Sequence, residues 1–96
     1  MTHAPAAYAL AGEVDASTAP FHLERLQAMI AKSPSDSVVV ELDRTRMLDT
    51  TGLGMLINAR KSASDAGKRL VLRGANHRLV RLMEIAGTYE LFDWEP

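Results

Sequence analysis

The chain contains no cysteine among its 96 residues. This absence excludes a disulfide framework, a thiolate zinc site and a catalytic thiol, and it is compatible with a reducing cytoplasm. An excess of charge of one sign is also lacking, because eleven Lys and Arg residues stand against twelve Asp and Glu residues. A dedicated nucleic-acid binder needs a basic face that displaces counterions from phosphates, so we expect no nucleic-acid partner.

Long apolar runs are missing as well. No run approaches the roughly 20 residues that span a bilayer, and residues 1–5 lack the basic start and apolar stretch of a secretory signal. We therefore expect a cytoplasmic protein without direct membrane insertion. Glycine-rich phosphate cradles are also absent, since Gly52-Leu53-Gly54 has Ile57 where G-x-G-x-x-G requires its third glycine.

Residue patterns typical of catalysis are scarce. The three histidines, His3, His22 and His77, include no pair spaced i, i+4 and no partner for a serine nucleophile, so we expect solvated surface side chains. Asp49-Thr50-Thr51-Gly52 has one residue more than the Asp-Thr-Gly of small dimeric aspartic proteases, which are almost entirely β. The sequence therefore predicts no enzyme activity, no bound metal and no cofactor.

The apolar pattern indicates alternating strands and helices. A hydrophobic fraction of 47% and a length of 96 residues fit one domain over 1–96, with a flexible N-terminus at 1–6. The order β-α-β-α-β-α-β predicts an α/β fold with right-handed crossovers and helices on at least one face of the sheet. Strands are expected at about 7–14, 37–42 and 69–73, helices at about 20–32, 51–66 and 77–86, and an extended tail at about 89–94.

The segment Asp49-Thr50-Thr51-Gly52 stands at the start of the second predicted helix. Asp49, Thr50 or Thr51 can each serve as the helix N-cap. A hydroxyl at this position is also a favourable place for a phosphate, because free backbone N–H groups and the helix dipole stabilise an anion there. A phosphate would add about −2 charge without disturbing the fold.

Three residues beyond the hydroxyls have properties suited to a binding surface. Gly52 and Gly54 leave the backbone bare, which allows close approach by another chain. Met55 lies off the apolar stripe of the predicted helix, so we expect it to be exposed and to offer an adaptable contact.

These motifs together resemble a known family. Met47-Leu48-Asp49-Thr50-Thr51-Gly52-Leu53-Gly54-Met55-Leu56 resembles the signature of the STAS domain, named for sulfate transporters and anti-sigma factor antagonists. Three further segments resemble other parts of that family in the same order: Leu10-Ala11-Gly12-Glu13-Val14-Asp15, Val38-Val39-Val40-Glu41-Leu42-Asp43, and Leu79-Val80-Arg81-Leu82-Met83 followed by Gly87. The resemblance implies a single STAS-like domain, with a mixed central β-sheet and helices packed mainly on one side.

The same resemblance implies a role as an anti-sigma factor antagonist. In such systems the unphosphorylated antagonist binds an anti-sigma factor that is a serine/threonine kinase, and thereby frees a sigma factor. The kinase phosphorylates the residue after the signature Asp, usually a serine, and a metal-dependent protein phosphatase reverses the step. By position the acceptor is Thr50, with Thr51 as the second choice, and Asp15, Ser17 and Thr18 share the binding face.

A second role is open on the same resemblance. STAS-like accessory subunits also dock on the ATPase of lipid-transport ABC complexes, where the pair Asp49-Thr50 resembles the docking edge. The partner expected from sequence is therefore a protein in both cases, and its identity is left open between a kinase-type anti-sigma factor and a transporter ATPase.

Overall fold

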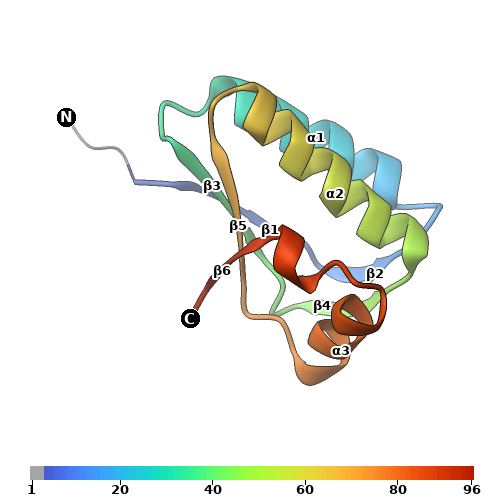
Figure 1. Cartoon of the computed structure of the whole chain (residues 1–96). Coiled ribbons are helices and arrows are strands. Elements are labelled where there is room, and N and C mark those ends of the chain that lie inside the picture. Colours follow the sequence, from blue (N-terminus) through green and yellow to red (C-terminus); the bar gives the residue numbers. More distant parts are fainter. Residues whose placement is uncertain (1–3) are drawn as a thin grey trace.

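The computed structural model describes residues 4–96, which form one α/β domain (Figure 1). The predicted class and the three predicted helices are confirmed. The elements in chain order are β1 (Ala6–Ala9), β2 (Gly12–Val14), α1 (Ala19–Lys32), β3 (Ser37–Glu41), β4 (Thr45–Leu48), α2 (Thr50–Asp65), β5 (Arg69–Arg73), α3 (His77–Ile85), the 3-10 helix η1 (Tyr89–Leu91) and β6 (Asp93–Glu95).

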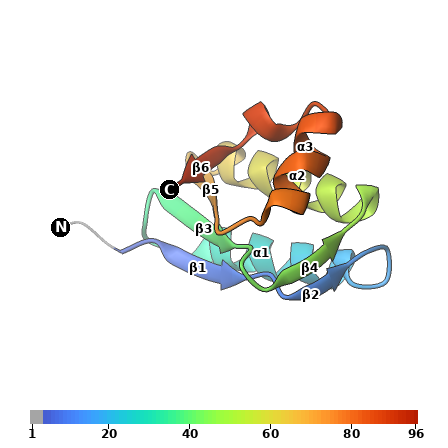
Figure 2. The same cartoon turned by 90° about the horizontal axis from the view of Figure 1, so that it is seen from below.

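The strands form two sheets. Four strands pair in the order β1-β3-β5-β6, and a separate two-stranded sheet joins β2 to β4. Each of these strand pairs within residues 4–96 is parallel, so this range contains no antiparallel pair of the expected mixed sheet. Helices α1 and α2 lie side by side over one face of the four-stranded sheet, and α3 lies apart from α1 (Figures 1 and 2).

The strand expected at 7–14 is in fact two strands. Gly12 has φ of +80°, a conformation that side-chain-bearing residues rarely adopt, and the strand register shifts between Gly12 and Glu13. As a result β1 pairs with β3, whereas β2 pairs with β4. Ala6 already belongs to β1, although the sequence placed it in the flexible N-terminus; residues 1–3 lie outside the described residues.

Strand β4 was not predicted from sequence because half of its residues are polar. Thr45 is only 2% exposed, and its hydroxyl donates a hydrogen bond to the Leu10 carbonyl oxygen. This bond satisfies a polar group that would otherwise be costly to bury. Thr45 thereby joins the start of β4 to the segment between β1 and β2.

The helix ends follow the predicted local signals. The Asn76 side chain accepts a hydrogen bond from the Leu79 N–H at 2.9 Å and caps α3. Gly67 follows α2 with φ of +72°, as expected of a left-handed residue after a helix C-cap. The apolar faces of the helices and strands meet in one core, whose fully buried large side chains include Leu10, Leu26, Leu42, Leu56, Leu72 and Met83.

Candidate functional site

The candidate site lies where the two-stranded sheet ends. Val14 of β2 pairs with Leu48 of β4, and the strands are parallel, so their carboxyl ends meet at one edge. The next residues, Asp15 and Asp49, begin the connections to α1 and α2. The Asp49 N–H donates to the Val14 carbonyl oxygen at 3.2 Å. The structure thus brings the Asp15 loop and the signature segment together.

Asp49 is the N-cap of α2. Its Oδ1 accepts from the Gly52 N–H at 2.9 Å, and its backbone carbonyl accepts from the Leu53 N–H at 2.9 Å. Of the three residues able to cap this helix, the cap therefore falls on Asp49. Thr50 and Thr51 are the first two residues of α2, and both are exposed. The capping carboxylate leaves two hydroxyl side chains at the surface of the first helical turn.

The loop after β2 is ordered by its own side chains. Asp15 Oδ1 accepts from the Ser17 backbone N–H at 2.9 Å and from the Ser17 hydroxyl at 2.6 Å, and these bonds lower the pKa of Asp15. The Thr18 hydroxyl donates to the Glu13 carbonyl oxygen at 2.9 Å and accepts from the Asp15 N–H at 3.1 Å. Ser17 is exposed, whereas Asp15 and Thr18 are half-buried. These three residues form an ordered loop, called the rim below, beside the start of α2.

The expected role of Gly52 in approach by another chain does not match its surroundings. Gly52 is buried, and a Cβ placed there would lie 2.5 Å from the Val14 carbonyl oxygen and 2.7 Å from Leu48 Cδ1. The bare backbone therefore serves contact between α2 and the strands of the same chain.

The expected exposure of Met55 is wrong. The side chain is only 3% exposed, because α2 packs against both the sheet and α1 and therefore buries more than one narrow stripe. A sequence pattern that allows for a single buried face cannot reveal the second contact. Met55 nevertheless borders the surface, as part of the lining of a groove.

That groove lies between α1 and α2 and has a volume of about 390 Å³. On the α2 side the groove is lined by the predicted site residues Thr51, Gly54 and Met55 together with Asn58. On the α1 side it is lined by residues that the sequence analysis did not predict to be part of a site. The missed residues lie roughly 30 positions earlier, and nothing in their own pattern marks them as part of a site. The lining consists of Ala19, Pro20, Leu23, Thr51, Gly54, Met55 and Asn58.

The histidine expectation needs one correction. His22 is half-buried, and its Nδ1 lies 2.6 Å from the Tyr8 hydroxyl. Burial lowers the pKa of His22 and raises the pKa of Tyr8.

Within residues 4–96 no group of three or more His, Cys, Asp or Glu side chains could hold a metal ion. No helix in that range is long and apolar enough to cross a membrane.

The two parallel sheets, the paired loops and the capped signature helix define a small α/β domain of the STAS type. Residues 1–92 match the family model described as "Mlab, STAS domain". The chain belongs to the STAS-domain family.

Several relatives have named roles. An anti-sigma-B factor antagonist of Listeria monocytogenes serovar 1/2a (strain ATCC BAA-679 / EGD-e) is 38% identical over 86 residues, covering 88% of this chain and 73% of that protein. The crystal structure of an anti-sigma factor antagonist from Mycobacterium paratuberculosis is similar with a TM-score of 0.72 and 27% identity, over 94% of this chain and 75% of the other.

The fold also matches the antagonist SpoIIAA in its two solved forms. The unphosphorylated form gives a TM-score of 0.70 at 12% identity, over 94% of this chain and 77% of that one. The phosphorylated Bacillus form gives a TM-score of 0.68 at 13% identity, over 94% and 81%. At these identities the likeness is one of fold.

Proposed function

We propose that this chain is an anti-sigma factor antagonist-like regulatory protein that binds a kinase-type anti-sigma factor and is controlled by phosphorylation of Thr50. The observation that carries the proposal is the exposure of Thr50 as the first residue of α2, directly after the capping Asp49. It occurs in a chain 38% identical to a named antagonist. The role is regulatory, and the kinase and a metal-dependent phosphatase supply the chemistry.

The geometry explains how a phosphate would change binding. Thr50 is exposed, so a phosphate on its hydroxyl is accommodated without repacking the core. It adds about −2 charge next to the Asp49 carboxylate, whose hydrogen bond from the Gly52 N–H keeps it in place. A partner surface that fits the unphosphorylated helix end then meets like charge and a polar group that is costly to desolvate. Binding is released, and the phosphatase restores it.

Thr51 is the second hydroxyl of the same turn. It is exposed as well, but it lines the groove between α1 and α2, whereas Thr50 does not. We therefore assign the switch to Thr50 and contact with the partner to Thr51, with Asp15, Ser17 and Thr18 forming the adjoining rim. The proposed site of action is the cytoplasm.

The proposal is tested by comparing the wild type with Thr50→Ala and Thr50→Glu in affinity capture followed by phosphosite mapping. The expected result is a kinase-type anti-sigma factor recovered by the wild type and Thr50→Ala but lost by Thr50→Glu, with phosphate found at Thr50. Ser64→Glu is the matched control, because it adds the same charge at an exposed position in the last turn of α2. Equal recovery by all variants, with no phosphate at either threonine, would refute the switch.

A second candidate function uses the same surface. The family model that matches residues 1–92 is described as "Mlab, STAS domain", and a threonine in place of the family's usual serine is compatible with a docking edge that is not phosphorylated. In this case the chain is an accessory subunit that docks on the ATPase of a lipid-transport ABC complex. The same experiment separates the two, because it would then recover a transporter ATPase and find no phosphate at Thr50.

A further inference from the structure

Gly54 is a glycine that the fold does not explain. Glycine is the least favourable residue in a helix interior apart from proline. Gly54 lies inside α2, its φ is not among the positive ones, and a Cβ placed there would meet no atom within 4 Å apart from its chain neighbours and the nearby backbone of its own helix. Gly52, two residues earlier, is the opposite case, since its Cβ would collide with backbone. Within residues 4–96, packing therefore requires glycine at 52 and leaves it without a use at 54.

The free space in front of Gly54 belongs to the groove between α1 and α2. Leu23 and Pro20 line it on the α1 side, and Gly54 and Met55 line it on the α2 side. Further along the two helices, the Gln27 side-chain amide donates to the Ser62 hydroxyl at 3.1 Å and links α1 to α2. The groove thus lies between this link and the N-terminal ends of both helices.

The lining determines what can bind. None of the seven lining residues carries a charge, and the exposed surface of the groove is mainly apolar. An ionised group placed there would lose its hydration without gaining a charged partner, whereas an apolar group would gain by leaving water. The occupant is therefore an uncharged aliphatic side chain.

We infer that the protein partner of this chain inserts a leucine- or methionine-sized side chain into the groove over Gly54. The inference rests on the proposed function, because the groove continues directly from the switch: Thr51 lines it, and Thr50 is the preceding residue. Gly54 contributes by being bare, since any side chain there would occupy the space that the partner fills. A phosphate on Thr50 stands beside the same insertion.

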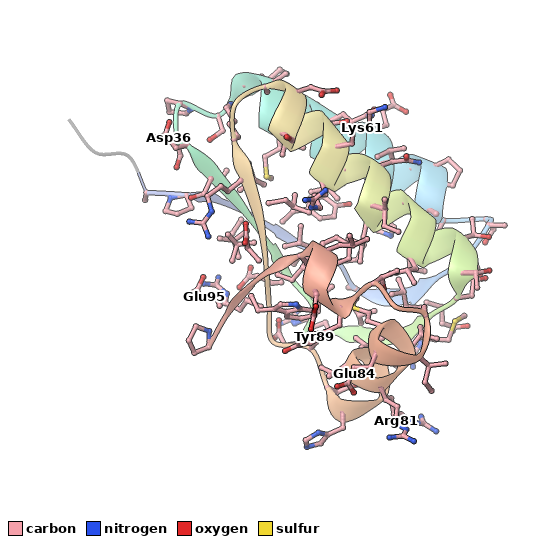
Figure 3. All side chains as sticks on the ribbon, viewed as in Figure 1. Asp36, Lys61, Arg81, Glu84, Tyr89 and Glu95 are labelled. Carbon is pink, nitrogen blue, oxygen red and sulfur yellow. The ribbon has the colours of Figure 1, made fainter. Side chains whose placement is uncertain are left out.

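The test fills the groove without disturbing the core. Gly54→Leu places a side chain into open space, and Gly54→Ala gives a smaller version of the same change. Lys61→Leu is the matched control, because it adds the same side chain to the same helix at an exposed position that points away from the sheet (Figure 3). Thermal unfolding of each variant, followed by circular dichroism, shows that the fold is retained.

The first measurement uses a small probe and does not depend on the partner's identity. N-acetyl-leucine methylamide is titrated to millimolar concentrations into protein with ¹³C-labelled methyl groups, and N-acetyl-aspartate methylamide serves as the charged comparison. The expected result is saturable shifts of the Leu23 and Met55 methyl signals with the leucine probe only, abolished in Gly54→Leu. Absence of these shifts, or equal shifts in Gly54→Leu, overturns the inference.

The second measurement uses the partner recovered by the wild type in the capture experiment. Gly54→Leu is expected to weaken its binding by tenfold or more, about the effect of losing one buried aliphatic side chain, while Lys61→Leu leaves it unchanged. If Gly54→Leu binds the partner as well as the wild type does, the inference that the partner inserts a side chain into the groove is wrong, while the proposed switch at Thr50 stands. If no kinase-type partner is recovered, the proposed function is wrong, and the probe titration still tests whether the groove binds an aliphatic side chain.

Discussion

The two glycines of the signature predict stability changes of opposite sign. In Gly52→Ala the new Cβ would lie 2.5 Å from the Val14 carbonyl oxygen, about 0.9 Å closer than an ordinary contact beginning at 3.4 Å. This oxygen cannot rotate away, because it is backbone and accepts the Asp49 N–H at 3.2 Å. Relief therefore requires α2 to move off β2. In Gly54→Ala the new methyl group meets no atom within 4 Å apart from its chain neighbours and the nearby backbone of its own helix.

The magnitudes follow from general costs. Forcing a methyl group into a packed site costs about 1–3 kcal/mol, and the fixed backbone oxygen places Gly52→Ala at about 2–3 kcal/mol, of which alanine recovers about 1 kcal/mol through helix propensity. We expect Gly52→Ala to lower the free energy of unfolding by about 1–2 kcal/mol, which for a domain of this size is a drop of roughly 5–15 °C in Tm. Gly54→Ala gains propensity without a clash, so it should raise the free energy of unfolding by about 0.5–1 kcal/mol.

Urea unfolding followed by circular dichroism measures both changes. The midpoint should fall for Gly52→Ala and rise for Gly54→Ala, with the dependence on urea unchanged if both variants keep a native-like fold. A Gly52→Ala protein within about 0.3 kcal/mol of wild type would show that α2 does not depend on contact with the Val14 carbonyl. A Gly54→Ala protein as unstable as Gly52→Ala would show that Gly54 is needed by the fold, and the groove would lose its main support.

Three further predictions concern the surroundings of the site. Asp49→Ala should cost about 0.5–2 kcal/mol of stability through the lost N-cap, whereas Asp49→Asn should stay close to wild type in the same urea assay. Because the pKa of His22 is lowered, the contribution of His22 to stability is complete above the usual pKa of 6.5 and is lost as the pH falls through the lowered pKa. The difference in urea midpoint between pH 7.5 and pH 5 should therefore be smaller in His22→Gln than in the wild type. Thr45→Val should cost about 1–3 kcal/mol, measured by thermal unfolding, because it leaves the Leu10 carbonyl oxygen without its buried donor.

Local signals in the sequence were sufficient for the three helices. Asn76, three residues before the N–H that it caps, and Gly67, directly after a helix end, act through bonds within a few residues, so their roles can be predicted without the tertiary structure. The placement of Asp49 and Thr50 at a helix start is of the same kind. These features depend on backbone geometry more than on which distant element lies alongside.

Features that depend on distant elements could not be predicted in this way. Met55 is buried because α1 lies against α2, and the sequence does not say how the two helices align. The polar strand at Thr45 forms because β2 offers a partner and Leu10 offers an acceptor 35 positions away. The contact between Tyr8 and His22 likewise joins a strand to a helix. The groove could not be predicted for the same reason, since three of its seven lining residues come from α1 and four from α2.

The two-stranded sheet of β2 and β4 has a consequence for how this domain can diversify. Both loops of the site are attached to this small sheet, which is separate from the four-stranded sheet (Figure 2). Loops held at the end of a rigid element tolerate change better than the element itself. Under the proposed function, substitutions at exposed positions around Asp15 or Thr50 would alter the choice of partner while the hydrophobic interior under β3 and β5 stays as it is. The exposed residues of the site, such as Thr50 and Ser17, can therefore change at little cost to folding, whereas Asp49 and Gly52 are held by the fold itself.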